Sequence, residues 1–597
     1  MTSNYVKRCA TRAWLGVILV ALGGCLTEPE PDPRLSALSL SYGALDPSFT
    51  ANVTEYTVEV PFLVTNLRVT AVAAAPGASI TVDGVAVTSG SESQPLDLAE
   101  GDTTIDIEVT AVDGVTTKTY AVTVARQDIA QFAQQAYVKA SNTGASNLFG
   151  RSIAVSGDTL VVGAPHEASG ATGIDGDQTD TSAGDSGAVY VFVRDGGSWI
   201  QQAYLKASNA EEEDNFGWSV AVEGDTLAVG SPLEDSSARG VNAGGEADNS
   251  TSSSGSVYVF VRTGSTWSQQ AYIKASNTGS GDRFGAGVAL SGDTLAVSAY
   301  AEKSSAAGVN GDQDNDGAEE AGAVYVFVRD EGVWSQQAYV KASNTQAGDA
   351  FGWSLDLSGD TLAVGAPFED SSATGINGNQ ADAGASASGA VYVYAREGVR
   401  WVQQAYVKAS NTGSGDWFGW SVTLDGDTLA VAAPSEDSSA VGIDGDQSDD
   451  SAVNAGAAYV FVRSGTTWSQ QAYVKASNTQ TSDEFGYSVA LAGDALLVTA
   501  IREDGGGVGI NTGNQLDNGL TDGGAAYLYT RAGSTWTQRA YLKPSNTGPA
   551  DLFGHAAAIE GDTIVISAHN EDSGATGIDG DQADDSTLNA GAVYVFR

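Results

Sequence analysis

Apolar and polar residues alternate one by one in short runs along most of the chain. Clear cases are Tyr56–Val60, Ile105–Val109 and Tyr120–Val124, and turn residues such as Asp83-Gly84 separate the runs. Successive side chains of a β-strand point to opposite faces of a sheet, so this period of two predicts half-buried strands. We therefore predict an all-β protein made of short strands and tight turns.

A longer period of 67 or 68 residues is superimposed on the short one. In one unit the apolar runs occupy residues 351–357, 361–367, 389–394 and 401–408, which predict four antiparallel strands, called A to D in that order. The A–B and C–D turns are short, and a long polar loop joins B to C. Each unit opens with a Phe-Gly pair, whose phenylalanines are Phe149, Phe216, Phe284, Phe351, Phe418, Phe485 and Phe553.

The two ends of the repeat region indicate how it closes. The chain stops after strand C of the seventh unit, at residues 592–597, and an unpaired D-like run, 132–139, precedes the first Phe-Gly. We predict a seven-bladed β-propeller over residues 130–597, whose N-terminal strand completes the last blade and removes the open sheet edges. An open solenoid is the alternative, but it gives no reason for the split unit.

One aromatic side chain stands near the start of strand D in each unit. Because it recurs once per blade, we interpret it as packing between blades rather than as a platform for sugars. Phe132 takes this place in the displaced N-terminal strand, and the other members are Trp199, Trp267, Trp334, Trp401, Trp468 and Trp536.

Two short motifs resemble a known repeat family. Phe-Gly opens strand A in all seven units, and Gly-Ala-Pro ends strand B at residues 163–165 and 365–367, with drifted versions in the other five units. This pattern resembles FG-GAP repeats, which build the propeller at the N-terminus of integrin α subunits and occur in many bacterial surface proteins. The resemblance implies a propeller that acts in recognition at a cell surface.

Residues 34–127 lack the repeat and contain about seven short alternating runs, which predict a small β-sandwich. The segments 35–40, 56–58, 101–102 and 118–126 resemble the bacterial cadherin-like β-sandwich family. Such modules usually act as spacers, and this segment offers no candidate site. A carbohydrate-binding role of the sandwich is the alternative.

The N-terminus has the layout of a secretory signal, with a basic segment followed by a short apolar run. It resembles a bacterial lipoprotein signal over residues 1–24, and that resemblance implies that Cys25 carries the lipid. An ordinary signal peptide with an incidental cysteine is the alternative. The basic segment contains Lys7, Arg8 and Arg12, and the apolar run covers residues 14–22.

Residues 25–33 are acidic and rich in proline, and we interpret them as a stiff tether. Leu26, rather than Asp, follows the lipidation cysteine, which favours the outer membrane in a Gram-negative cell. We therefore expect an exported lipoprotein of the bacterial outer membrane or cell surface.

The charge balance excludes some partners. The 597 residues carry 74 acidic and 28 basic side chains, a net charge of −46, which becomes −49 once the signal leaves with its three cations. Nucleic acid is excluded as a partner, because phosphate binding needs Lys and Arg. Both cysteines, Cys9 and Cys25, lie near the N-terminus, so the rest of the chain forms no disulfide or thiolate metal site.

The B–C loops are the longest connections, about 21 residues from His166 to Ser186, and loops of this length without structure of their own are usually functional or disordered. Antiparallel strands place all seven on one rim, which we predict to be the ligand-binding face. A glutamate follows strand B in every unit, and these predicted rim residues are Glu167, Glu234, Glu302, Glu369, Glu436, Glu503 and Glu571.

Closely spaced Asp and Asn oxygens separated by Gly in these loops suit Ca²⁺, which makes calcium the candidate cofactor. Plain polar turns are the alternative. The integrin-like calcium loop joins strands A and B, where this chain has only a tight turn, so its ligands do not transfer. The candidate ligands are Asp175, Asp177, Asp444, Asp446, Asp579 and Asp581, with Asp312, Asp314 and Asp316 in a segment that starts like an EF-type loop.

The sequence contains no recognisable catalytic constellation, so we expect no enzymatic activity. His166, His555 and His569 fall in the first and last units, where a metal or acid–base site is the alternative to drift. The Lys in strand D and the Arg ending strand C recur once per blade, and we interpret them as strand-end salt partners.

We predict a lipid-anchored, monomeric surface protein that binds a protein or glycan through its acidic loop rim, with Ca²⁺ as a candidate requirement. A hydrolase or lyase acting on polysaccharide or lipid is one alternative, and an envelope scaffold is another. An enzyme should break the sevenfold symmetry with unlike polar residues at the rim or the axis. The sequence offers only the three histidines and the divergent sixth loop, Gly505-Gly506-Gly507, as such breaks.

Overall fold

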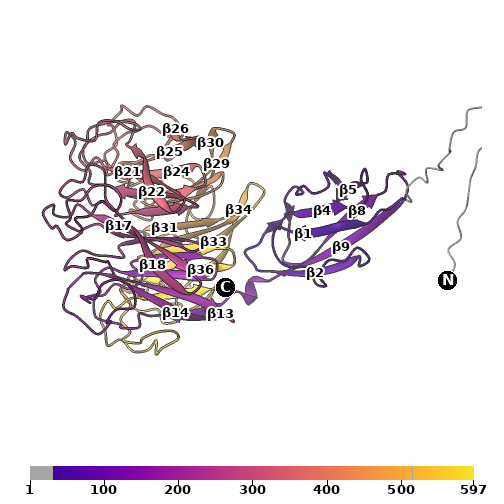
Figure 1. The fold of residues 1–597 in the computed structure, drawn as a ribbon, viewed down its shortest axis with the longest axis horizontal. Coiled ribbons are helices and arrows are strands. Elements are labelled where there is room, and N and C mark those ends of the chain that lie inside the picture. Colours follow the sequence, from indigo (N-terminus) through magenta and orange to yellow (C-terminus); the bar gives the residue numbers. More distant parts are fainter. Residues whose placement is uncertain (1–30, 514) are drawn as a thin grey trace, which may run out of the picture. The chain divides into compact units, whose positions relative to one another are not determined.

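The computed structural model describes residues 31–513 and 515–597, so the predicted signal, Cys25 and most of the tether lie outside the described residues. The chain divides into two compact units. The smaller contains Arg68–Gln94, Thr104–Thr123 and the described residues up to Val58, and the larger contains Glu59–Leu67, Pro95–Thr103 and Val124–Arg597. Apart from one 3₁₀ turn, η1 (Ile129–Gln131), the regular elements of the described chain are strands (Figure 1).

The N-terminal strands form three hydrogen-bonded groups. Alternate side chains of the long strands are buried, among them Ile105, Ile107 and Val109, which is the pattern that the sequence predicted for the sandwich. β1 (Leu35–Leu40) pairs with β4 (Val69–Ala73), and β3 (Asn66–Leu67) pairs with β7 (Leu96–Asp97). The five-stranded sheet has the order β2 (Glu55–Val60), β9 (Thr117–Arg126), β8 (Gly101–Thr110), β5 (Ser79–Val82) and β6 (Val85–Val87).

Residues 134–597 form seven four-stranded antiparallel sheets, the blades of the predicted propeller. The A strands are β11 (Ser152–Ser156), β15 (Ser219–Glu223), β19 (Val288–Ser291), β23 (Ser354–Ser358), β27 (Val422–Asp425), β31 (Phe485–Ala492) and β35 (Phe553–Glu560). The B strands are β12 (Thr159–Ala164), β16 (Thr226–Ser231), β20 (Thr294–Ala299), β24 (Thr361–Ala366), β28 (Thr428–Ala433), β32 (Ala495–Ala500) and β36 (Thr563–Ala568).

The outer strands complete each blade. The C strands are β13 (Ala188–Asp195), β17 (Ser256–Thr263), β21 (Ala323–Asp330), β25 (Ala390–Glu397), β29 (Ala457–Ser464), β33 (Ala525–Ala532) and β37 (Ala592–Phe596). The D strands are β14 (Ser198–Leu205), β18 (Thr266–Ile273), β22 (Val333–Val340), β26 (Arg400–Val407), β30 (Thr467–Val474), β34 (Thr535–Leu542) and, for the last blade, β10 (Gln134–Val138).

The propeller closes as the sequence predicted. β10 pairs with β37, so a strand from the start of the repeat region completes the sheet that β35, β36 and β37 form. The A strands contact one another in order, and β35 contacts β11, which closes the ring. A cavity of about 350 Å³ is lined by residues of A strands from all seven blades, so these strands surround the axis.

The Phe-Gly motif is explained by packing. Each phenylalanine is fully buried and meets a tyrosine of strand C edge-on, as Phe216 meets Tyr258 with ring centroids 5.3 Å apart. The following glycine, Gly217, has a φ of +91°, and a Cβ there would lie 2.6 Å from the carbonyl oxygen of Ala188. Only glycine fits this conformation and this approach of two backbones.

Tryptophans of the D strands join neighbouring blades, which confirms their interpretation as packing residues. Trp401 is 3% exposed, and its Nε1 donates a hydrogen bond to Oε1 of Gln337 on the preceding blade, at 2.8 Å. Arg396, at the end of strand C, binds Asp360 of its own blade through Nε (2.6 Å) and Thr294 of the preceding blade through Nη1 (2.9 Å). These contacts recur around the ring.

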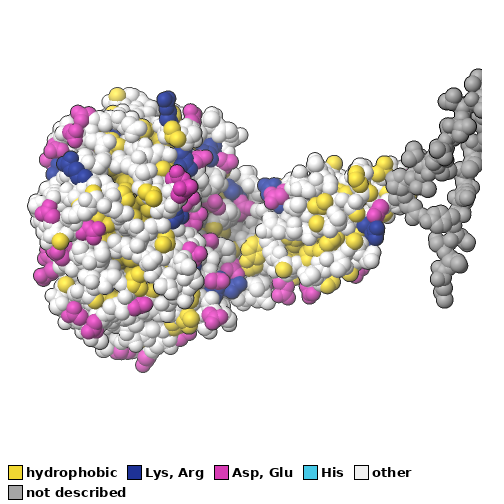
Figure 2. Space-filling model, in the orientation of Figure 1, with side chains coloured by type: hydrophobic (Ala, Val, Ile, Leu, Met, Phe, Trp, Pro, Cys, Tyr) yellow, Lys and Arg dark blue, Asp and Glu magenta, His cyan; other side chains and the backbone are white. Residues whose placement is uncertain are grey.

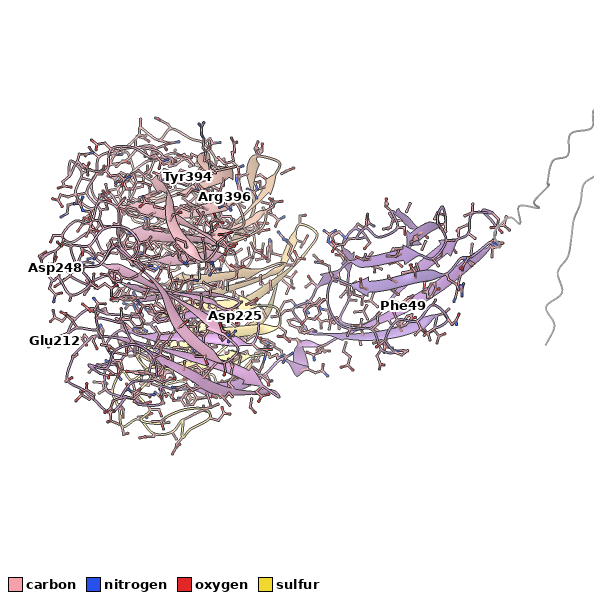
Figure 3. All side chains as sticks on the ribbon, viewed as in Figure 1. Phe49, Glu212, Asp225, Asp248, Tyr394 and Arg396 are labelled. Carbon is pink, nitrogen blue, oxygen red and sulfur yellow. The ribbon has the colours of Figure 1, made fainter. Side chains whose placement is uncertain are left out.

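The two ends of the blades differ. Short A–B and C–D turns form one face, here called the turn face, and the long B–C loops and the D–A loops form the other, the loop face. Figure 3 shows Glu212 and Asp248, from a D–A and a B–C loop, on one side of the propeller, and Asp225 and Arg396, from the turns, on the opposite side. Figure 2 shows acidic side chains scattered over the visible surface of the propeller, with few basic ones among them.

Candidate functional site

The seven glutamates that the sequence placed on the binding rim are buried, so that prediction is wrong. Each is at most 2% exposed and forms an ion pair with the lysine of strand D in its own blade; Oε2 of Glu369 lies 2.9 Å from Nζ of Lys408. A buried carboxylate does not meet a macromolecular ligand. The pairs are Glu571–Lys139, Glu167–Lys206, Glu234–Lys274, Glu302–Lys341, Glu369–Lys408, Glu436–Lys475 and Glu503–Lys543.

Each pair is also tied to the preceding blade. Oε1 of Glu369 accepts hydrogen bonds from the hydroxyl of Tyr406, at 2.8 Å, and from Nδ2 of Asn344, at 3.0 Å. Asn344 belongs to the D–A loop that leaves the preceding blade, three residues after Lys341, whose own partner is Glu302. One Lys-Ala-Ser-Asn segment therefore holds the glutamates of two consecutive blades. The sequence carried this signal in its repeated Lys-x-Ser-Asn, but Lys and Glu were interpreted separately.

The predicted calcium ligands are turn residues. The first aspartate of each motif has a positive φ, and its Oδ1 accepts the backbone N–H of the strand D tyrosine, as Asp444 does from Tyr473 at 2.9 Å. Asp175 and Asp579 do the same. The second aspartates, Asp177, Asp446 and Asp581, each accept the N–H of the residue two positions later.

The EF-like segment also forms a turn rather than a cage. Oδ1 of Asp312 accepts the N–H of Asp314, and the carbonyl oxygen of Asp312 accepts the hydroxyl of Ser304, while Asp316 joins no cluster. Across residues 31–513 and 515–597, no group of three or more His, Cys, Asp or Glu is gathered as a metal would need. The hydrogen bonds of these aspartates are those of polar turns, the alternative to calcium binding, and calcium binding by the nine aspartates stays a prediction.

Six other aspartates, two positions before Phe-Gly, are buried without a cation. Burial raises the pKa of Asp416 to about 7, against the opposing effect of the Gly413 N–H, and the nearby Glu436 adds to the rise. The first unit carries Asn147 at this place. The pKa is raised to about 7 for Asp214, Asp282, Asp349, Asp416 and Asp551, and to about 8 for Asp483.

The residue after Phe-Gly breaks the sevenfold pattern, and all seven copies line one cavity of about 570 Å³, here called the axial pocket. This position starts strand A, the strand nearest the axis, at the loop face. The volume of the axial pocket lies in the range of small-molecule binding sites. The seven residues are Arg151, Trp218, Ala286, Trp353, Trp420, Tyr487 and His555, and the lining is completed by Arg283, Tyr300, Ser421 and Ser488.

Aromatic rings form a continuous arc around more than half of the axial pocket. The ring centroids of Trp353 and Trp420 lie 4.9 Å apart, and Tyr300 lies 5.1 Å from Trp353. Tyr487 continues the arc, 5.7 Å from Trp420 and 5.5 Å from His555. The tryptophans and tyrosines of the arc are only partly buried, so the arc presents aromatic surface to the pocket.

Two arginines face the rest of the pocket. The guanidinium carbon of Arg151 lies 4.2 Å from the ring centroid of Trp218, and that of Arg283 lies 5.4 Å from Tyr300. Neither arginine forms an ion pair with a described residue. Burial lowers the pKa of Arg151 from its ordinary value, although an arginine stays charged in water at neutral pH.

Two of the three histidines meet, and both belong to the last blade. The rings of His555 and His569 lie 3.8 Å apart, and Nδ1 of each is buried without a hydrogen-bond partner. Burial lowers the pKa of His569 to about 3 and that of His555 well below its ordinary value. His166 is partly exposed, and its Nδ1 lies 4.0 Å from Oδ1 of Asp185. The buried pair is neutral at physiological pH and does not exchange protons readily there.

Sequence reasoning missed the axial pocket, although its signal was present. The residue after Phe-Gly varies between Arg, Trp, Ala, Tyr and His, whereas the Phe and Gly before it repeat in all seven units. In a repeat this regular, a position that holds a polar or aromatic side chain in six units and alanine in one indicates a functional site rather than a structural contact.

Comparisons with known proteins agree with both halves of the architecture. Residues 35–127 match the cadherin-like β-sandwich domain. The FG-GAP repeat matches residues 132–192, 199–260, 267–327, 334–394, 401–461, 468–529 and 536–596, which together make up more than half of the chain.

Other similarities are short or weak. A protein of Evansella cellulosilytica named "Putative membrane protein" is 38% identical over 101 residues, which cover 17% of this chain and 15% of that protein. A hypothetical selenium-binding protein of Sulfolobus tokodaii is 8% identical with a TM-score of 0.31, over 73% of this chain and 86% of that structure. A quinoprotein alcohol dehydrogenase-like protein of Bacteroides thetaiotaomicron is 7% identical with a TM-score of 0.27, over 93% and 99%.

Breaking one buried ion pair is expected to cost about 3–5 kcal/mol of unfolding free energy. Lys408→Met leaves Glu369 charged and buried, whereas the double variant Lys408→Met/Glu369→Gln removes both charges, keeps an acceptor for Tyr406 and should recover part of the loss. Arg502→Ala is the control, since it breaks a pair whose arginine side chain is 50% exposed and should cost under about 1 kcal/mol. Denaturant unfolding measures all three, and equal costs for Lys408→Met and Arg502→Ala would contradict the argument.

Asp416→Asn is expected to stabilise the protein at pH 8, on the order of 2 kcal/mol. The raised pKa means that the folded state holds a proton that the unfolded chain, with a pKa near 3.8, releases. Wild-type stability from this group is fully present below about pH 4 and is lost as pH rises through about 7. The advantage of the Asn variant should therefore grow from pH 4 to pH 7 and then level off. Melting temperatures across this range test it, and a constant difference would refute it.

Proposed function

The chain belongs to the FG-GAP repeat family, and we propose that it is a cell-surface protein that recognises a ligand in the axial pocket on the loop face of its propeller. Family membership and a cadherin-like domain favour recognition or adhesion at a surface. The name of the Evansella relative, a membrane protein, is in line with that place, although most of that relative lies outside the match.

One observation carries the proposal. The contacts that hold the blades recur almost residue for residue, yet the seven side chains after Phe-Gly differ and converge on one cavity. A framework position would repeat like its neighbours, as Glu369 and Lys408 do. Trp353 and Trp420 also leave part of their rings exposed. Aromatic surface in contact with water does not stabilise the folded protein, so its presence here favours a binding role.

The pocket is suited to binding rather than to catalysis. His555 and His569 are the residues that the enzyme alternative would use, and burial keeps both neutral. No Asp or Glu is among the residues that line the axial pocket, so no carboxylate of the lining assists them in acid–base chemistry. We therefore propose a binding protein without catalytic activity, in place of a hydrolase, lyase or envelope scaffold.

The proposed placement is export with a lipid on Cys25, the tether 25–33 and the sandwich 34–127 as a spacer that carries the propeller away from the membrane. No helix in the described parts of the chain is long and apolar enough to cross a bilayer. We propose a monomer that binds a protein or glycan and no nucleic acid, since its net charge is −46.

The purified full chain is expected to bind at least one member of a panel of glycans and extracellular proteins and to release it chemically unchanged. Trp420→Ala should weaken that binding at least about fivefold, since truncating a central aromatic contact costs about 1 kcal/mol or more. Val399→Ala, at a 75% exposed position of the turn face, is the control and should bind as the wild type does. Conversion of the bound ligand, or binding that survives Trp420→Ala, would contradict the proposal.

Cys25→Ser is expected to move the protein from the membrane fraction to the soluble fraction of a bacterial host. Without the thiol there is no attachment point for the lipid, and no other membrane anchor is proposed. Immunoblots of fractionated cells measure the shift, with Cys9→Ser as the matched control. Unchanged membrane association of Cys25→Ser would rule out the lipid anchor.

A further inference from the structure

We propose that the axial pocket recognises an acidic carbohydrate, with its aromatic arc packing against sugar rings and Arg151 and Arg283 binding the sugar carboxylates. This inference rests on the proposed function and names the ligand class of that same pocket. Its evidence is the charge of the lining, the aromatic surface and the unpaired polar groups.

The lining of the axial pocket is unlike the rest of the protein in charge. The chain contains 74 acidic residues, yet none of the eleven residues that line the pocket is Asp or Glu, and two are Arg. A neighbouring cavity of similar size on the loop face, about 630 Å³, is lined by Asp551, Glu571, Asp572 and Asp585. Sorting of charge on this scale favours an anionic ligand in the axial pocket.

The two arginines are not needed by the framework. Seven arginines at the ends of the C strands pair with aspartates of the A–B turns in their own blades, and Arg396 with Asp360 is one such pair. Arg151 and Arg283 belong to no such set and form no ion pair within residues 31–513 and 515–597. A guanidinium stacked on Trp218 keeps its N–H edge free for a planar bidentate acceptor, and a carboxylate has that geometry.

The aromatic arc supplies the other half of a sugar site. A pyranose ring has faces of C–H groups that pack against aromatic rings and an edge of hydroxyls. Trp353, Trp420 and Tyr487 present tilted, partly exposed rings side by side across three blades. A small inorganic anion would bind the arginines but make no use of the aromatic surface. A lipid chain would need an enclosed apolar tunnel. A sugar ring that carries a carboxylate contacts both the arginines and the aromatic arc.

A buried polar group in the wall of the pocket points the same way. His555 is 8% exposed, and its Nδ1 has no hydrogen-bond partner. Buried polar atoms without partners are rare in folded proteins and call for an explanation. The imidazole is neutral, so it suits a hydroxyl rather than a second anion. Its place beside Tyr487 puts it at the end of the aromatic arc, where the edge of a stacked sugar would lie.

Calorimetric titration of the full chain with oligosaccharides of polygalacturonate, alginate and hyaluronate tests the proposal, each paired with its methyl-esterified form as a matched neutral probe. We expect binding of at least one acidic oligosaccharide, and at least about tenfold weaker binding of its ester. Arg151→Gln and Arg283→Gln should each weaken the acidic ligand about tenfold, as loss of a charged hydrogen bond does, and leave the ester unchanged. Trp420→Ala should weaken both.

Arg400→Gln, an exposed arginine on the turn face, is the matched control and should bind as the wild type does, and melting temperatures verify that each variant is folded. Equal binding of acid and ester, or acid binding unaffected by both arginine variants, overturns the inference. Failure of all three acidic probes, with a protein ligand bound in a Trp420-dependent way, also overturns it and leaves the proposed function standing. Acid binding that ignores Trp420 contradicts both.

Discussion

The propeller depends on a closed ring of buried Lys–Glu pairs. Taking both charges out of water costs several kcal/mol per ion, and only good geometry with further hydrogen bonds repays that cost. Each Glu here meets Lys in its own blade and Asn from the blade before, as Glu369 meets Lys408 and Asn344. Since the Asn follows the Lys of its own blade by three residues, every blade completes the polar network of the next. A blade whose neighbour is missing would keep its Lys–Glu pair but lose the Asn hydrogen bond to the buried carboxylate, so closure of the ring completes the polar network of every blade.

That ring explains how one site arises in a repetitive molecule. The Lys–Glu–Asn links lie toward the loop face and the Arg–Asp–Thr links lie on the turn face, so each pair of blades is fixed at both ends. Strand B between them is buried throughout. With the blades held from outside the axis, the residue that follows Phe-Gly carries no framework contact. It is free to be Arg151 in one blade and Trp420 in another, and seven such positions meet because the A strands surround one axis.

The fold could be predicted from the sequence because local residue patterns determine each strand and the same patterns recur in seven units. Alternation predicts each strand, and the displaced run at 132–139 predicts closure, which β10 and β37 confirm. The site was not predictable in the same way. Glu369 and Lys408 recur in every blade, which indicates that both residues are important but not that their side chains form an ion pair. The sequence also does not show whether a polar residue that follows a strand is exposed or buried. Asp444 resembled a calcium ligand because the same oxygen that binds a cation also accepts the N–H of Tyr473.

The distribution of charge limits how the axial pocket works. A net charge of −46 repels an acidic ligand at long range, but in physiological salt that field decays over about 8 Å. The attraction of Arg151 acts at contact, where the ligand and the aromatic side chains displace water between the two charges. A ligand with charge alone therefore gains little from approaching this protein. One that also carries a ring for Trp353 and Trp420 gains apolar contact before its carboxylate reaches the guanidinium. The acidic surface thus sharpens selection for ligands that satisfy both halves of the pocket at once.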